Sequence, residues 1–142
     1  MTGILFVCSA NVYRSRVFEA VMRREIRERG LESDFDVDSA GVFPDYGTGI
    51  LPAAAECLSR NGVPYRDGEA RALSPYEYGE WDLIICLDRR VAGSAALILG
   101  GDPEGKISVV PGLSDPPCTA SGADSVYRAA VAFCARLLDG SE

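Results

Sequence analysis

The segment "ILFVCSANVYRSRVFEAVMRREI", residues 4–26, joins a buried strand to a helix through a short polar loop. Its first five residues form an apolar run bounded by turn-forming residues, which is typical of a fully buried strand. From Ser15 to Arg29, apolar side chains recur at helical spacing. Cys8 therefore stands at the end of the predicted strand, and Arg14 stands six residues later at the start of the predicted helix.

The rest of the chain alternates apolar runs with helical patterns. Further strands are predicted at 34–41, 81–88 and 106–112, and further helices at 51–62, 89–101 and 121–140. Ser121 or Asp124 is the expected N-cap of the last helix. Strands separated by helices form right-handed βαβ units and a parallel sheet. We therefore expect one α/β domain over residues 1–142, with a four-stranded parallel sheet between two layers of helices.

The composition argues against nucleic-acid and membrane partners. The net charge of −7 has the wrong sign for a nucleic-acid-binding surface. No apolar run approaches the roughly 20 residues that span a bilayer. The start "MTGILFVCS" lacks the basic region of a signal peptide. We therefore expect a cytoplasmic protein.

The numbers of histidines and cysteines limit the chemistry. The chain has no histidine, which removes Ser-His-Asp and Cys-His catalysis. None of its five cysteines forms a CxxC pair, so a zinc site is not expected, and we predict no metal or cofactor. An odd number of cysteines leaves at least one free thiol.

The loop between the first strand and its helix has the composition of an anion-binding cradle. Backbone N–H groups at a helix N-terminus lack partners, and the helix dipole adds positive charge there. Arg14 offers a planar fork of donors to two phosphate oxygens. Ser15 can donate a hydrogen bond to a thiolate, and Asn11 tolerates a left-handed conformation. These residues predict a nucleophilic Cys8 that holds a tetrahedral oxyanion. The alternative is that Cys8 is only a small core residue.

The motif "VCSANVYRS" in a short α/β chain resembles the low-molecular-weight protein tyrosine phosphatases, whose loop reads C-x-x-N-x-x-R-S. Four further segments follow in the family's order. They are "VDSAG" (37–41), the pair "ARAL" (70–73) and "WDLIICLD" (81–88), and "SDPP" (114–117). The resemblance covers nearly the whole chain.

The resemblance implies a role for each matching residue. Cys8 would be the nucleophile, Arg14 the phosphate clamp, and Ser39 the brace of Asn11. Asp115 would protonate the leaving oxygen and then activate water against a phosphocysteine. The alternative for Asp115 is a turn-forming aspartate before proline. The implied phosphate-binding loop is Ser9, Ala10, Asn11, Val12, Tyr13, Arg14 and Ser15.

Several positions depart from the family pattern. Ala10 stands where the family usually has glycine, and Tyr13 replaces a second loop cysteine. Arg16 replaces a common proline. Gly68 stands where a histidine is often found, so the resemblance implies that one brace of the loop is missing.

The candidate substrate walls also differ from the family pattern. Aromatic residues that usually follow the general acid are absent, and Phe43 and Tyr46 are the candidate walls in their place. Val12 lacks the hydroxyl of the threonine found in relatives specific for phosphoarginine, which favours a phosphate monoester.

The favoured function is a cysteine-dependent phosphomonoester hydrolase of the protein-tyrosine-phosphatase type, with a phosphorylated protein as its substrate. One alternative is a phosphatase of a small phosphorylated metabolite, and another is a non-catalytic phosphate-binding module. Arsenate reduction is less favoured, because arsenate reductases of this fold need two further cysteines close together. Cys57 and Cys86 are widely separated in the chain.

Overall fold

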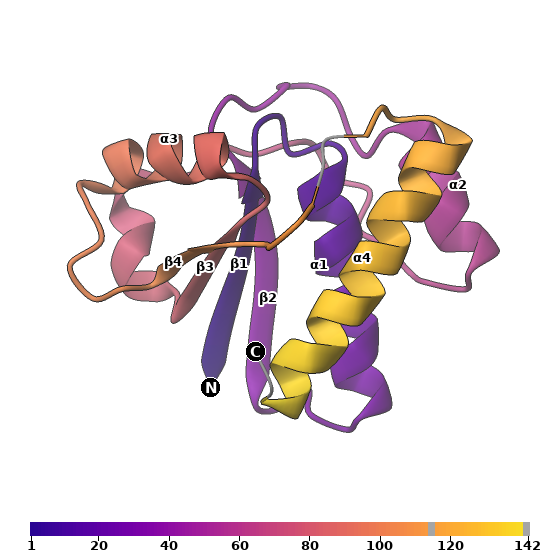
Figure 1. The fold of residues 1–142 in the computed structure, drawn as a ribbon, viewed down its shortest axis with the longest axis horizontal. Coiled ribbons are helices and arrows are strands. Elements are labelled where there is room, and N and C mark those ends of the chain that lie inside the picture. Colours follow the sequence, from indigo (N-terminus) through magenta and orange to yellow (C-terminus); the bar gives the residue numbers. More distant parts are fainter. Residues whose placement is uncertain (114–115, 141–142) are drawn as a thin grey trace.

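The computed structural model describes residues 1–113 and 116–140, and its elements follow the predicted alternation (Figure 1). The strands are β1 (Thr2–Cys8), β2 (Phe35–Gly41), β3 (Leu83–Cys86) and β4 (Ile107–Val109). The α-helices are α1 (Arg14–Glu28), α2 (Pro52–Arg60), α3 (Arg89–Leu99) and α4 (Ala120–Asp139), and a 3₁₀ helix η1 spans Pro75–Glu80. Within these described ranges, no helix is long and apolar enough to cross a membrane.

The four strands form one parallel sheet in the order β2-β1-β3-β4, which confirms the predicted fold class. The strand order reverses beside β1, and ligands of open α/β sheets bind outside the carboxyl ends of the strands at such a point. Cys8 pairs with Gly41 at the end of β2, and Val7 pairs with Cys86 at the end of β3. The loops that follow β1, β2 and β3 therefore meet at one edge of the sheet.

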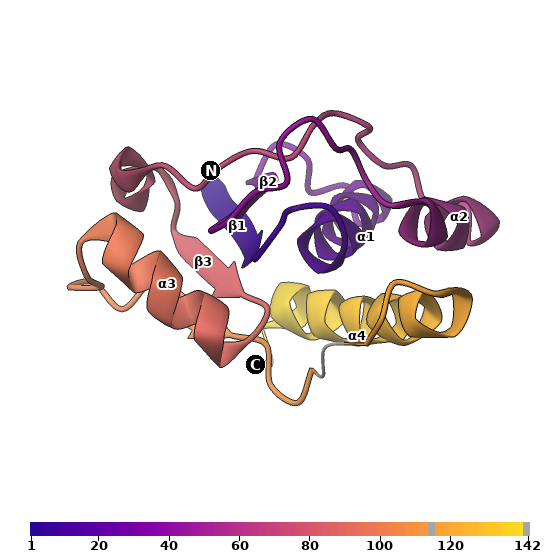
Figure 2. The same ribbon diagram turned by 90° about the horizontal axis from the view of Figure 1, so that it is seen from above.

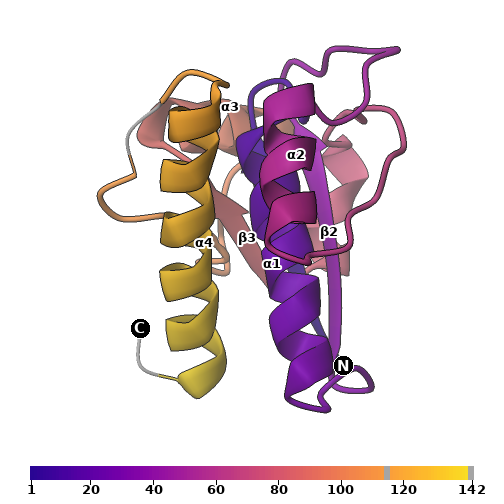
Figure 3. The same ribbon diagram turned by 90° about the vertical axis from the view of Figure 1, so that its right-hand side faces the viewer.

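Helices cover both faces of the sheet. Successive side chains of β1 point to opposite faces, so they pack against different helices. Ile4 and Phe6 belong to an apolar cluster shared with α1, α2 and α4. Leu5 and Val7 belong to a second cluster shared with α3. Figure 2 shows α3 on one side of the sheet and the other three α-helices on the opposite side, and Figure 3 shows α1 and α4 packed side by side. Burial on both faces explains why β1 is a continuous apolar run.

The expected N-cap of the last helix is wrong. α4 begins at Ala120, and the hydroxyl of Thr119 accepts a hydrogen bond from the Gly122 N–H over 3.2 Å. A Cβ on Gly122 would lie 1.9 Å from the carbonyl oxygen of Pro117, so glycine permits this close approach. Asp124 instead accepts a hydrogen bond from Arg60 on α2.

The 3₁₀ helix η1 is an element that the periodicity analysis misses. Its N-cap is Ser74, whose side chain and that of Glu77 form a capping box. The sequence "SPYE" contains the S-x-x-E signature of this box, so the signal was present.

Candidate active site

The loop between β1 and α1 wraps around the sulfur of Cys8. This cysteine ends β1 and is 4% exposed. The hydroxyl oxygen of Ser15 lies 2.9 Å from the sulfur, and the N–H of Asn11 donates to it over 3.3 Å. Both groups can donate a hydrogen bond to the sulfur. The thiolate is the nucleophilic form of cysteine.

Asn11 holds the loop in shape. Its φ of 59° makes it the only described residue other than glycine with a positive φ, as its place in the tight loop predicts. Its buried amide donates to the hydroxyls of Ser15 and Ser39, each over 3.0 Å. Its side-chain oxygen accepts the N–H of Arg71 over 3.0 Å. The contact between Ser39 and Asn11 that the family resemblance implies is therefore present.

Gly41 lets the loop pack against the end of β2. A Cβ at this position would lie 2.6 Å from the carbonyl oxygen of Ser9 and 3.1 Å from the Cβ of Asn11. No real Cβ approaches a backbone oxygen so closely, so a larger residue would push the loop away. The next two residues fix the contact, because Val42 and Phe43 donate backbone hydrogen bonds to Cys8 and Ser9.

Arg16 connects the loop to the backbone around Gly68. The expectation that the loop lacks a supporting contact there is therefore corrected. The guanidinium of Arg16 is buried, the residue being 2% exposed. It donates to the carbonyl oxygens of Asn11, Arg66 and Gly68 over 3.0, 2.9 and 2.6 Å. Burial, followed by repulsion from the Arg66 cation, lowers the pKa of Arg16 below its usual value. A side chain of α1 thus supports the loop by binding the carbonyl oxygen of Gly68.

A buried carboxylate extends the network below Ser39. The Ser39 hydroxyl donates to Glu19 over 2.5 Å, and Glu19 is 2% exposed. Arg66 contacts both carboxylate oxygens of Glu19 over 3.2 Å, and Arg23 contacts one of them over 3.2 Å. A buried charge needs such partners, because an unpaired one is strongly destabilising. Hydrogen bonds therefore connect the Cys8 sulfur through Ser15, Asn11 and Ser39 to a paired carboxylate.

Arg14 is oriented by an aspartate at the end of the neighbouring strand. Its Nη2 lies 2.9 Å from an oxygen of Asp88, and Arg14 itself is 6% exposed. Asp88 also caps α3, because its other oxygen accepts the Val91 N–H over 2.8 Å. Burial tends to raise the pKa of Asp88, but the hydrogen bonds from Val91 and Arg14 outweigh it and lower that pKa. Sequence reasoning missed Asp88, although an aspartate after a buried strand and before a helix is a typical N-cap.

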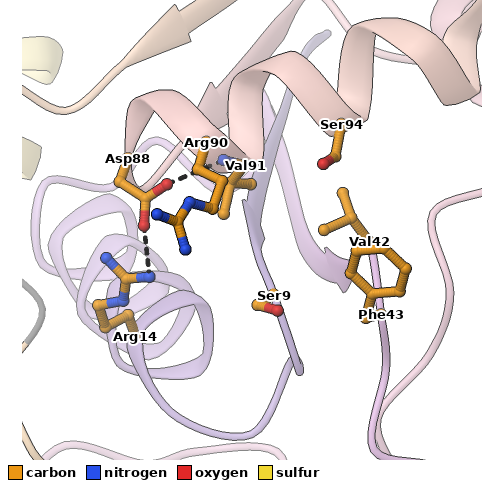
Figure 4. A pocket seen from close by; sticks show the side chains of 8 residues that line it. All are labelled: Ser9, Arg14, Val42, Phe43, Asp88, Arg90, Val91 and Ser94. Carbon is orange, nitrogen blue, oxygen red and sulfur yellow. Dashed lines mark hydrogen bonds and ion pairs between the residues drawn. The ribbon is translucent and has the colours of Figure 1, made fainter.

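A cavity of about 670 Å³ opens beside Arg14. This volume lies within the range of small-molecule sites. Phe43 lines it and is 73% exposed, whereas Tyr46 is 71% exposed and does not line it. Of the two candidate substrate walls, only Phe43 is placed at the cavity. The lining residues, drawn in Figure 4, are Ser9, Arg14, Val42, Phe43, Asp88, Arg90, Val91 and Ser94.

The candidate general acid, Asp115, lies outside the described residues. The description resumes at Pro116, and the Tyr13 hydroxyl donates to the carbonyl oxygen of Pro117 over 3.1 Å. Tyr13 thus links the loop around Cys8 to the segment that follows Asp115. Sequence reasoning placed this tyrosine in the phosphate-binding loop but did not predict its contact with the segment after Asp115.

The arrangement defines a class of protein. Cys8 is a buried thiol with two hydrogen-bond partners, and its loop joins a strand to a helix that begins at Arg14. Such a loop can hold a phosphate against the cysteine sulfur. The model of one family, described as low molecular weight phosphotyrosine protein phosphatase, matches residues 3–111. The chain belongs to this family. The match ends before Asp115.

Individual relatives agree with the family match. Low molecular weight phosphotyrosine protein phosphatase 2 of Drosophila melanogaster is 37% identical over 89 residues, which are 61% of this chain. The protein-tyrosine-phosphatase YfkJ of Bacillus subtilis is 33% identical over 101 residues, which are 70% of this chain. The chain spans 53% and 65% of the length of these two curated relatives. The crystal structure of YfkJ superposes with a TM-score of 0.88 and 28% identity, covering 99% of this chain and 94% of YfkJ.

Proposed function

We propose that the protein is a phosphomonoester hydrolase of the protein-tyrosine-phosphatase type that works through a phosphocysteine. One observation carries the proposal: the Cys8 sulfur has hydrogen-bond donors from Ser15 and from the Asn11 backbone, in a loop that ends at Arg14. Membership of the phosphatase family supports it.

In the first step, the loop N–H groups and Arg14 bind the phosphate oxygens of the ester. The Cys8 thiolate attacks phosphorus, and a P–S bond forms as the P–O bond to the leaving group breaks. Asp115 gives its proton to the leaving oxygen, because an alkoxide or phenoxide leaves poorly without one.

In the second step, the Asp115 carboxylate takes a proton from water, and the water oxygen attacks phosphorus. The P–S bond breaks, inorganic phosphate leaves, and the thiolate is regenerated. Both steps use only these side chains and water.

Phosphotyrosine in a protein is the substrate that we favour. The exposed ring of Phe43 at the rim of the cavity can pack against a phenyl ring, and offset or edge contacts between aromatic rings are favourable. The mechanism needs Cys8 as a free thiol, which a reducing compartment such as the cytoplasm preserves. The cytoplasm is therefore the proposed location.

Hydrolysis of p-nitrophenyl phosphate by the wild type and by Cys8→Ser tests the proposal. The wild type should turn over and be inhibited by vanadate, and Cys8→Ser should be inactive. Cys57→Ser is the matched control, because Cys57 is buried in α2 and a serine hydroxyl can keep its hydrogen bond to Asp124. Equal activity of wild type and Cys8→Ser would refute the proposal, and an inactive wild type that binds phosphate would indicate a binding module.

A further inference from the structure

The cavity beside Arg14 contains a second arginine. Arg90 lines it from α3, and Figure 4 shows its guanidinium projecting from that helix among the other lining side chains. Arg14 is paired with Asp88 over 2.9 Å. By contrast, the Arg90 guanidinium makes no hydrogen bond or ion pair with any residue that the structure describes. The cavity is therefore lined by two arginines: Arg14 is paired with Asp88, and the guanidinium of Arg90 is available to bind an anion.

The position of Arg90 suits a group beside the phosphate rather than the phosphate itself. Arg14 is buried at the end of the phosphate loop, whereas Arg90 is exposed. Apart from Asp88, whose carboxylate is paired with Arg14, the rest of the lining is apolar or neutral, with Val42 and Phe43 on one side and Val91 beside Arg90 (Figure 4). An anion near Arg90 would thus meet a single unpaired cation at an exposed position, where an ion pair contributes modestly and is weakened by salt.

The overall charge makes this local cation more selective. With a net charge of −7, the protein as a whole repels acidic ligands, and a positive spot at the cavity favours one orientation of such a ligand. We propose that Arg90 is a specificity-determining residue that binds a second anionic group of the substrate, an acidic side chain next to the phosphotyrosine of a protein. This inference rests on the proposed function, of which it specifies the substrate class.

The neighbouring Arg89 offers a matched control. It carries the same charge in the same turn of α3 and is also exposed. It lines a different cavity, of about 490 Å³, together with Asp88 and residues 109–113. If the effect is a nonspecific one of charge, replacing either arginine should reduce the preference for an acidic substrate. If the proposed contact exists, only the replacement of Arg90 should reduce it.

The test compares phosphotyrosyl peptides that differ only in an aspartate or asparagine next to the phosphotyrosine. For the wild type, kcat/KM should favour the acidic peptide about threefold to fivefold, the upper range for an exposed ion pair. Arg90→Ala should bring the ratio to about one, Arg90→Glu should invert it, and Arg89→Ala should keep it. The wild-type preference should also weaken in 1 M NaCl, because salt screens exposed charges.

An unchanged ratio in Arg90→Ala, or an equal loss in Arg89→Ala, would overturn the inference while leaving the phosphatase activity intact. A small bisphosphate that loses affinity in Arg90→Ala, while the peptides do not, would overturn the peptide assignment. If no peptide is hydrolysed, the proposed function fails, and the same peptides are titrated against Cys8→Ser. Tighter binding of the acidic peptide that disappears with Arg90→Ala would then support the inference, and equal binding would overturn it.

Discussion

The guanidinium of Arg16 donates a hydrogen bond over 2.6 Å to the carbonyl oxygen of Gly68. The same guanidinium binds the carbonyl oxygen of Asn11, so it connects the phosphate loop to a segment about fifty residues away in the chain. An arginine stays charged at neutral pH, so this support is not lost by deprotonation there.

Arg16→Met should show what this support contributes. The substitution keeps an apolar stem but removes every donor from three carbonyl oxygens. Hydrogen bonds to charged groups contribute most, so the free energy of unfolding should fall by about 2–3 kcal/mol in urea titrations. Arg27→Met, at an exposed position of the same helix, should change it by less than about 0.5 kcal/mol. Equal losses in the two variants would contradict this role of Arg16.

Asp88 has two functions that two substitutions can separate. Asp88→Asn keeps an oxygen for the Val91 N–H but removes the negative charge beside Arg14. Its stability should fall, because the buried Arg14 loses the charge of this ion-pair partner. The value of kcat/KM for p-nitrophenyl phosphate should fall about tenfold, because a misplaced clamp misaligns the phosphate. Asp88→Ala should show the same kinetic loss and also lose about 1 kcal/mol of stability with the helix cap. A kinetic loss confined to the alanine variant would show that the cap alone matters.

Glu77 should make stability depend on pH. It accepts two hydrogen bonds from Arg71, one from the Ser74 N–H and one from the Trp81 ring. Burial tends to raise the pKa of Glu77, but these hydrogen bonds, those from Arg71 foremost, outweigh it and lower that pKa. A folded-state pKa below the unfolded one stabilises the fold above the unfolded value of about 4.3, and the effect is lost as pH falls through the folded value.

Glu77→Gln should therefore reduce the free energy of unfolding by about 2 kcal/mol at pH 7. The difference from wild type should shrink as the pH falls below about 4. Urea titrations at several pH values measure it, with the exposed Glu80→Gln as control. A difference that does not vary with pH would show that the charge of Glu77 is not what stabilises this segment.

Asp115→Asn should lower kcat for phenyl phosphate by about 10²–10⁴, the usual contribution of general acid–base catalysis. The loss should be smaller for p-nitrophenyl phosphate, because nitrophenolate leaves with less need of a proton. Steady-state kinetics with both esters measures the contrast. Unchanged turnover of phenyl phosphate would remove Asp115 from the mechanism.

The fold and the centre of the site follow from local sequence signals. The apolar run of β1 identifies a strand buried on both faces. A cysteine at its end and an arginine before a helix indicate the candidate phosphate loop. The left-handed Asn11 follows from its place in that loop, because few other residues tolerate this conformation.

The remaining contacts depend on where distant segments meet. The pairing of Arg14 with Asp88 requires the register that places Val7 opposite Cys86. The role of Arg16 requires the segment around Gly68 to fold back beneath the loop. No periodicity or composition carries this information.

The mechanism requires Cys8 to be phosphorylated during turnover, and the mass of the enzyme trapped during turnover shows whether it is. The enzyme is mixed with p-nitrophenyl phosphate and denatured within the first turnover, and the peptide that contains Cys8 is then weighed. We predict the added mass of one phosphoryl group on Cys8, formed together with a burst of nitrophenol, which is the kinetic sign of a covalent intermediate. Full turnover with Cys8 never phosphorylated would show that the reaction does not pass through a phosphocysteine.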